Sequence, residues 1–224
     1  MKIGIVSAFE AEVDPFINSM CERTVEKHSM LSFHIGKYKD IQVVALYSGV
    51  CKVNASIATQ VLINKFEVTH VIVMGVAGAI AKELSIYDTV ISSEVAYHDV
   101  NEGILTQYHP WMKSIYFKAD PKMLAKMKEV NVHDQTVVIG RIVTGESFIE
   151  QEGREYIVEK YNPLCVDMET ASMAHVCYVN SIPFVAVRSI SDTPEESGDE
   201  AFSNYYKLAA QKSVEVVQRY LSAL

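Results

Sequence analysis

Three acidic residues come shortly after apolar segments that have the character of buried strands. They are Glu12, Glu169 and Asp192. A carboxyl group can give or take a proton, and ligands of open α/β sheets bind just beyond the carboxyl ends of the strands. Three carboxyl groups at that edge therefore favour an active site, with Glu146 as a possible fourth member. Each of them taken alone is more simply explained as a helix cap.

Other kinds of catalytic site find less support in the sequence. The glycine-rich segment 75–78 (GVAG) would form a turn that admits another part of the chain or a ligand close to the backbone, but it matches neither a dinucleotide-binding nor a Walker motif. His98 and Asp99 are adjacent, so on a strand they would point to opposite faces and chelate a metal poorly. Cys51 lies beside Lys52, which would lower the pKa of its thiol, and it is a minor candidate for a nucleophile. We expect no metal and no cofactor.

The composition excludes several classes of protein. The 224 residues are 49% hydrophobic and 21% charged, as in ordinary globular proteins. The 28 acidic and 20 basic residues give a net charge of −8, which argues against a nucleic acid or an anionic membrane surface as partner. Four scattered cysteines and the lack of a long apolar run predict a cytoplasmic protein without disulfides or a membrane span.

Apolar segments rich in β-branched residues alternate along the chain with segments of helical period. We expect strands at residues 3–6, 30–35, 41–47, 70–74, 89–92, 136–143, 164–168 and 183–190. We expect helices at residues 9–20, 52–64, 121–130, 152–160, 169–179 and 200–224. This order predicts a single α/β domain over residues 1–224, with a central mixed, mostly parallel twisted sheet flanked by helices on both faces. Residues 101–118 lack a period and are expected to form a long loop, a lid or a contact surface.

Five motifs resemble those of the bacterial 5′-methylthioadenosine/S-adenosylhomocysteine nucleosidases, which belong to the nucleoside phosphorylase and nucleosidase superfamily. They are residues 2–6 (KIGIV) with Glu10 and Glu12, then 48–55 (SGVCKVNA), 144–149 (TGESFI), 166–171 (VDMETA) and 187–192 (VRSISD). The resemblance covers essentially the whole chain. It implies a nucleoside phosphorylase-like fold and a homodimer that needs no cofactor. It also implies hydrolysis of the bond between adenine and a 5′-thio-substituted ribose, for methionine salvage and clearance of methylation by-products.

The resemblance also implies a role for each polar residue of these motifs. Asp192 acts as the general acid at purine N7 and needs a raised pKa, and Ser191 either positions it or helps to bind the base. Glu169 binds the ribose hydroxyls. Glu12 is the general base that activates water, and Arg188 orients it. The acidic stretch around Glu12 would repel phosphate, which favours hydrolysis over phosphorolysis.

A further set of residues is expected, from the same resemblance, to bind the nucleoside. The set is Phe9, Val50, Val76, Ala77, Gly78, Phe148, Ile149, Asp167, Met168 and Phe202. Within it, Phe148 and Ile149 wall the adenine, Met168 touches the sugar and Phe202 covers the thioalkyl group. Two features depart from the family pattern: Val76 stands where many members have serine, and residues 101–118 lack the usual aromatic and glycine pattern.

Because of these departures from the family pattern, two alternative functions stay open. The chain could hydrolyse another 5′-modified adenosine or a futalosine-type nucleoside, or it could bind a nucleoside without turnover. The three carboxyl groups speak against a pure binding protein, because binding adenine does not require Glu12.

Overall fold

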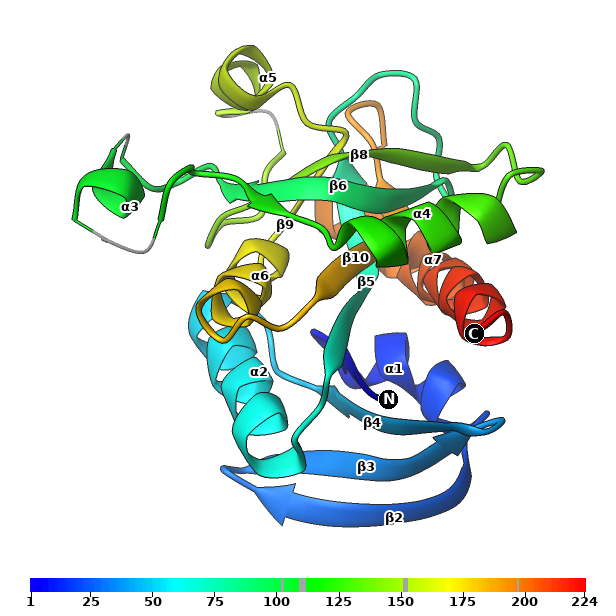
Figure 1. The fold of residues 1–224 in the computed structure, drawn as a ribbon. Coiled ribbons are helices and arrows are strands. Elements are labelled where there is room, and N and C mark those ends of the chain that lie inside the picture. Colours follow the sequence, from blue (N-terminus) through cyan, green and yellow to red (C-terminus); the bar gives the residue numbers. More distant parts are fainter. Residues whose placement is uncertain (102, 109–111, 151–152, 197) are drawn as a thin grey trace.

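A mixed β-sheet forms the centre of the computed structural model, which describes residues 1–101, 103–108, 112–150, 153–196 and 198–224 (Figure 1). Its strands are β1 (Lys2–Ser7), β2 (Cys21–His28), β3 (Leu31–Tyr38), β4 (Ile41–Tyr47), β5 (His70–Ala79), β6 (Thr89–Tyr97), β7 (Phe117–Lys118), β8 (Val137–Thr144), β9 (Cys165–Asp167) and β10 (Phe184–Asp192). The helices are α1 (Glu10–Ile17), α2 (Lys52–Phe66), α3 (Ile104–Gln107), α4 (Pro121–Val130), α5 (Arg154–Tyr161), α6 (Thr170–Val179) and α7 (Gly198–Leu221).

The strand order explains how distant segments meet at one edge of the sheet. It is β10-β6-β8-β9-β5-β1-β4-β3-β2, and a further pairing of β10 with β5 closes five of these strands into a ring. Among the described residues, five pairings are parallel and five antiparallel, and the long β5–β10 and β6–β8 pairings are parallel. The expected mixed α/β sheet is therefore confirmed. The carboxyl ends of β1, β5, β8, β9 and β10 come together at one side.

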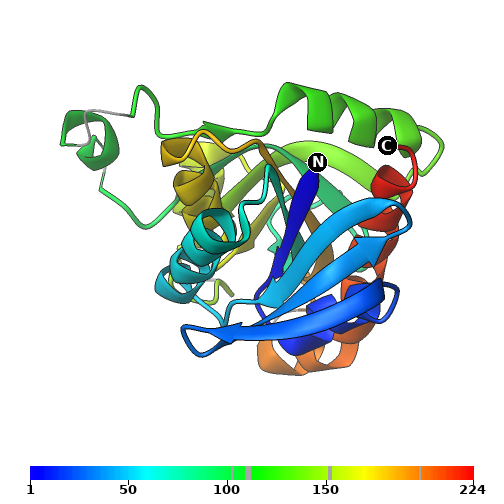
Figure 2. The same ribbon diagram turned by 60° about the horizontal axis from the view of Figure 1, so that its bottom comes forward.

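Helices cover both faces of the sheet (Figures 1 and 2). Helices α1, α4 and α7 share one buried cluster, which includes Ile5, Phe16 and Val217. On the other face α2 packs against α6, in a second cluster that includes Val6 and Leu62. Ile5 and Val6 are neighbours on β1, so the alternation of side chains along one strand supplies both clusters.

Most predicted elements occur at or near their expected positions, and three differences matter. The sequence predicts a strand that ends at Met74 and a glycine turn at 75–78, but β5 continues to Ala79 because β10 and β9 pair with it there. Strand β6 likewise extends to Tyr97. Strand β2 has no counterpart in the prediction, since it is a polar edge strand whose eight residues are all exposed and so carry no apolar period.

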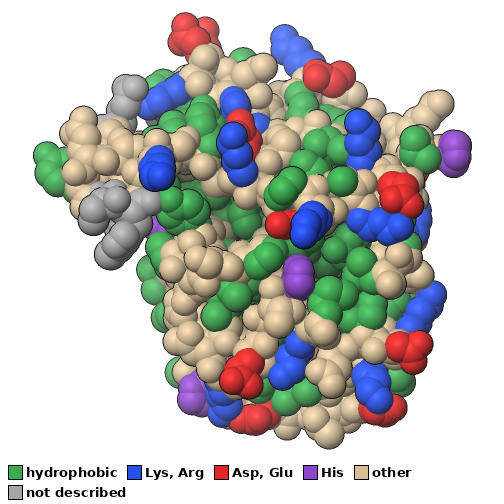
Figure 3. All heavy atoms as spheres, viewed as in Figure 1, with side chains coloured by type: hydrophobic (Ala, Val, Ile, Leu, Met, Phe, Trp, Pro, Cys, Tyr) green, Lys and Arg blue, Asp and Glu red, His purple; other side chains and the backbone are tan. Residues whose placement is uncertain are grey.

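Parts of two predicted segments lie outside the described residues. Residues 101–118 contain α3 and β7, with 102 and 109–111 not described, and the helix expected at 152–160 is described from Gly153 onward, with α5 beginning at Arg154. Within the described ranges, no helix is long and apolar enough to cross a membrane. All four cysteines are free, and Cys165 and Cys177 are buried as expected. Basic and acidic side chains are interspersed over the face seen in Figure 3.

Candidate active site

A pocket of about 220 Å³ lies at the carboxyl ends of the strands, which is small on the scale of ligand sites. Of the sequence-predicted site residues, all but Arg188 line it. The lining residues are Ala8, Phe9, Glu12, Val50, Val76, Ala77, Gly78, Ser147, Phe148, Ile149, Val166, Asp167, Met168, Glu169, Ser191, Asp192 and Phe202. The prediction missed Ala8, Ser147 and Val166, although each lies within or next to a quoted motif.

Glu12 is held at the pocket by backbone donors on two sides. Its Oε2 accepts hydrogen bonds from the N–H groups of Ala8 (2.7 Å) and Phe9 (3.2 Å), and its Oε1 accepts one from Val76 (2.8 Å). The residue is fully buried. Burial raises the pKa of Glu12, while Arg188 and the three N–H groups oppose the rise. A carboxylate has about four acceptor positions, so one is left for a water molecule or a substrate hydroxyl.

Two glycines of β5 make room for carboxyl groups from other elements. A Cβ atom on Gly75 would lie 2.3 Å from Glu12 Oε1 and 2.6 Å from Arg188 Nη1. A Cβ atom on Gly78 would lie 2.7 Å from Asp192 Oδ2. The glycines therefore permit the close approach that their sequence suggests, but they do so within a strand and for side chains of the same chain.

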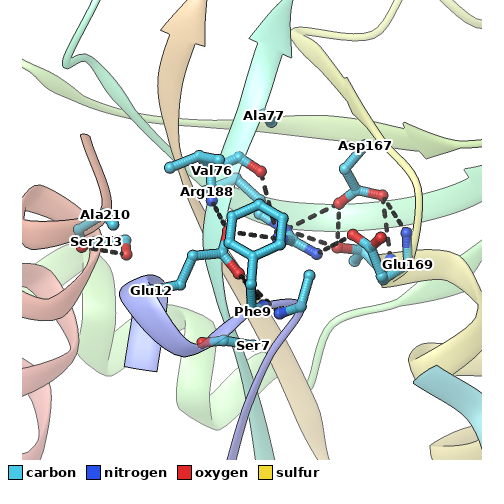
Figure 4. Close-up of polar contacts among 12 residues, drawn as sticks. Ser7, Phe9, Glu12, Val76, Ala77, Asp167, Glu169, Arg188, Ala210 and Ser213 are labelled. Atoms are coloured by element: carbon cyan, nitrogen blue, oxygen red, sulfur yellow. Dashed lines mark hydrogen bonds and ion pairs between the residues drawn. The ribbon is translucent and has the colours of Figure 1, made fainter. Parts of the chain in front are cut away.

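Arg188 lies below the pocket, fully buried among three carboxyl groups. Figure 4 shows Glu12 on one side of it and Asp167 and Glu169 on the other. Its nitrogens are 2.9 Å from Asp167 Oδ2, 3.4 Å from Glu169 Oε2 and 3.8 Å from Glu12 Oε1. Burial alone would lower the pKa of Arg188, but the three carboxyl groups outweigh it and the pKa rises. One guanidinium against three carboxyl groups leaves negative charge at the pocket floor when all are ionised.

Glu169 precedes α6 as its N-cap residue and faces the same pocket. Its Oε1 accepts a hydrogen bond from the N–H of Cys51 (3.0 Å), and its Oε2 accepts one from Arg188. Burial raises the pKa of Glu169 to about 7 and Asp167 adds to the rise, whereas Arg188 opposes it. The group therefore exchanges its proton near neutral pH, which suits a residue that meets a charged transition state.

Cys51 does not have the lowered pKa that its neighbouring lysine suggests. Burial and a hydrogen bond with Glu146 raise the pKa of the thiol and outweigh the lowering by Lys52, whose ammonium lies 2.8 Å from Asp99 and 3.8 Å from Glu146. Glu146 belongs to this partly exposed ion-pair group and does not line the pocket, so it is not a fourth member of the site. Cys51 contributes its backbone N–H to Glu169, from a backbone with φ of 78°.

Asp192 ends β10 and also lines the pocket. The Ser191 hydroxyl donates a hydrogen bond to its Oδ1 at 2.8 Å. Burial raises the pKa of Asp192, and Ser191 and Arg154 oppose the rise. A raised pKa keeps a carboxyl group protonated at higher pH, as a general acid requires.

Aromatic rings form another wall of the pocket. Phe202 meets Phe9 edge-on at 6.0 Å and Phe148 edge-on at 6.5 Å, and it stacks on Tyr206 at 5.2 Å. Such surfaces suit a planar base or a thioether. In the described part of the chain, no group of three or more His, Cys, Asp or Glu side chains could hold a metal ion.

Comparisons with known proteins agree with one another. The phosphorylase superfamily matches residues 2–223. A 5′-methylthioadenosine/S-adenosylhomocysteine nucleosidase of an Exiguobacterium species is 37% identical, over 97% of this chain and 96% of that protein. The structure of such a nucleosidase from Colwellia psychrerythraea 34H, in complex with adenine, has a TM-score of 0.90 and 31% identity, over 100% of this chain and 96% of that one. The futalosine hydrolase of Helicobacter pylori also has a TM-score of 0.90, at 28% identity over 100% of this chain and 98% of that one.

Proposed function

Because this chain belongs to the phosphorylase superfamily and, within it, to the family of the 5′-methylthioadenosine/S-adenosylhomocysteine nucleosidases, we propose that it hydrolyses the N-glycosidic bond of both nucleosides. The products are adenine and a ribose with the 5′-thio substituent. The observation that carries this proposal is the meeting of Glu12, Glu169 and Asp192 in one pocket that is also lined by aromatic rings. Each carboxyl group has the surroundings that one step of the reaction requires.

Asp192 acts on the departing base. Adenine leaves more easily when a proton reaches N7 as the glycosidic bond breaks, because the base then leaves without a negative charge. The raised pKa of Asp192 supports this role, since the carboxyl group must carry a proton before the reaction. Ser191 fixes the orientation of that carboxyl group through Oδ1, and Phe148 and Ile149 wall the base.

Glu169 acts on the sugar, which becomes positively charged as the base departs. Its carboxylate accepts a hydrogen bond from a ribose hydroxyl. Glu169 and Glu12 together place negative charge beside the cationic sugar, and Arg188 neutralises only part of it. Met168, also in the lining, packs against the ribose.

Glu12 acts on the attacking water molecule. Its remaining acceptor position takes the proton of the water as the oxygen bonds to the anomeric carbon. Over one turnover Glu12 gains a proton and Asp192 loses one, and exchange with solvent restores both. A phosphate ion in the place of water would meet the Glu12 carboxylate, and Arg188 already faces three carboxyl groups, so hydrolysis is favoured over phosphorolysis.

A homodimer is part of the proposal. Helix α2 exposes Val53 (68%) and Ile57 (47%) on one face, and the adjoining α6 exposes Val179 (47%). Apolar side chains grouped in this way suit a surface that is buried between two copies. Sedimentation equilibrium tests it, with a mass of one chain as the contradicting result. The cytoplasmic location stays a prediction.

The test of the function is adenine release from each nucleoside in buffer without phosphate. We expect release from both. No release, or release only after phosphate is added, would reject the hydrolysis. A second candidate substrate is a futalosine-type nucleoside, favoured by Val76 in the pocket and by the similarity to futalosine hydrolase. Ranking kcat/KM across a panel of nucleosides separates the two, and a higher value for futalosine would favour the second.

A further inference from the structure

Asp167 lines the pocket, yet both of its oxygens are already engaged by the protein. Its Oδ1 accepts hydrogen bonds from the Thr144 hydroxyl (2.5 Å) and from the N–H groups of Glu169 (3.2 Å) and Thr170 (3.1 Å). Its Oδ2 accepts the Thr170 hydroxyl and lies 2.9 Å from Arg188 Nε. Four hydrogen-bond donors fill the roughly four positions of a carboxylate, and the guanidinium adds an ion pair, so none is left for a ligand. The side chain is only 2% exposed.

The side chains that contact Asp167 belong to three separate elements. Thr144 ends β8, Thr170 begins α6 and Arg188 comes from β10. Two hydroxyl groups that donate to Asp167 also accept a hydrogen bond from a further group. The Thr144 hydroxyl accepts one from the N–H of Ala171 (2.9 Å), and the Thr170 hydroxyl accepts one from Arg188 Nε (3.0 Å). Asp167 is thus the point where the first turn of α6 is joined to the guanidinium below the pocket.

The position of Arg188 depends most on Asp167. Of the three carboxyl groups around the guanidinium, Asp167 is the closest, at 2.9 Å, against 3.4 Å for Glu169 and 3.8 Å for Glu12. At 3.8 Å Glu12 attracts Arg188 only through its charge, because a hydrogen bond requires a shorter distance. The link to Asp167 therefore sets where the guanidinium stands between the two reacting carboxyl groups.

We propose that Asp167 is a positioning residue that holds Arg188 and the start of α6, and thereby orients Glu169 and fixes the positive charge beside Glu12, without touching the substrate itself. This inference rests on the proposed nucleoside hydrolysis. It replaces the substrate-binding role that the sequence motif suggests for Asp167.

The place of Asp167 beside Arg188 and Glu169 also has an electrostatic consequence, which the pH dependence of the reaction reports. The charged or titratable groups around Arg188 and Glu169 are Glu12 from α1, Cys51 before α2, Asp167 and Cys165 from β9, and each other. Neutralising Asp167 removes a like charge beside Glu169 and leaves the guanidinium shared by fewer carboxyl groups. Both effects favour ionised Glu169, so the acid limb of the pH–rate profile moves to lower pH.

The first experiment compares Asp167→Asn with the wild type in adenine release from 5′-methylthioadenosine. We expect kcat to fall by about tenfold or more, KM to stay within about threefold, and the acid limb of kcat to move to lower pH. Binding of free adenine, measured by calorimetry, is expected to be retained, because Asp192, Phe148 and Ile149 make that part of the pocket. A rise in KM with kcat and the acid limb unchanged would overturn the proposal and make Asp167 a substrate ligand.

A pair of variants at Thr170 tests the same proposal if Asp167→Asn does not fold. Thr170→Val removes the hydroxyl that joins Asp167 to Arg188, whereas Thr170→Ser keeps it. We expect kcat to fall about fivefold or more in the valine variant with KM little changed, and to be rescued in the serine variant. A valine variant with the wild-type kcat would overturn the proposal.

A measurement that does not need turnover separates this inference from the proposed function. In ¹⁵N NMR spectra, the Nε–H signal of Arg188 should exchange slowly with solvent, and Arg188→Lys identifies it by its loss. The signal should move and exchange faster in Asp167→Asn, and an unchanged signal would overturn the inference. If the wild type releases no adenine, the proposed function fails, while this signal still tests the position of Arg188.

Discussion

Replacement of Glu12 by glutamine separates the charge of this group from its hydrogen bonds. The two oxygens of Glu12 accept backbone N–H groups from Ala8, Phe9 and Val76. Glutamine offers one oxygen and one NH₂ group. At least one of the three buried N–H donors would then face another donor, while the shape of the side chain stays nearly the same.

The stability of Glu12→Gln is set by two opposing effects. A buried N–H group without an acceptor costs about 1–3 kcal/mol. On the other side, burial raises the pKa of Glu12, so its protonated form is favoured in the fold and ionisation above that pKa destabilises the protein. A neutral amide removes this second cost at neutral pH. We expect a net loss of about 1 kcal/mol, which lowers the Tm by roughly 2–4 °C.

The activity of Glu12→Gln should fall far more than its stability. A general base contributes about 10²–10⁴-fold to a rate, or about 3–5 kcal/mol of barrier. The assay is steady-state adenine release, with thermal unfolding and adenine binding as checks on the fold. Glu10→Gln is the matched control, since it removes the same charge from an exposed position on the same helix and should keep kcat. A folded Glu12→Gln enzyme with more than about a tenth of the wild-type kcat would refute the role of Glu12.

Three further predictions follow from the environment of single residues. Asp192→Asn removes the transferable proton, so kcat should fall about 10²–10⁴-fold and the alkaline limb of the pH–rate profile should disappear; a retained limb would assign that proton to another group. The pKa of Glu169, about 7, lies above its ordinary 4.5, so the stability from its protonated form is complete below pH 4.5 and is lost as the pH rises through 7. Thermal unfolding of Glu169→Gln should therefore depend less on pH over this range, and an unchanged dependence would contradict the buried, protonated state. Cys51→Gly should raise the free energy of unfolding by about 1 kcal/mol. A non-glycine residue at φ of 78° is strained by about 1–3 kcal/mol, and glycine relieves this strain. Part of the gain is offset because glycine makes the unfolded chain more flexible. Cys51→Ala, which stays strained, is the control, and a glycine variant less stable than the alanine variant would rule out the strain.

The sequence predicts a helix or strand well where its apolar residues recur with a regular period and form its buried face. Helix α4 matches its predicted bounds, and Pro121 marks its first turn. Strand β2 escapes prediction because both of its faces are exposed, and it pairs only with β3 at the edge. The close approach at segment 75–78 is predicted correctly, but the turn is wrong, because the pairing of β9 and β10 that keeps this segment in β5 leaves no local pattern in the sequence.

The site is predictable as a set of positions but not as a set of contacts. The three carboxyl groups follow strand ends, where ligands of such sheets bind, whereas the apolar lining of the pocket is foreseen only through the resemblance of the motifs to the nucleosidase family. Which carboxyl group is left with a vacant acceptor position depends on how the donors of several elements are shared. The hydrogen bonds to Asp167 are saturated by Thr144, Glu169 and Thr170, whereas Glu12 keeps one acceptor position, and only the packed structure decides between them.

The most direct test is a crystal structure with a non-hydrolysable analogue of 5′-methylthioadenosine. We expect an Asp192 oxygen within about 2.6–3.2 Å of purine N7, and a water molecule between Glu12 and the anomeric carbon. We also expect a Glu169 oxygen to accept a hydrogen bond from a ribose hydroxyl. An analogue bound with N7 away from Asp192, or with Glu12 remote from the anomeric carbon, would contradict the division of labour among the three carboxyl groups.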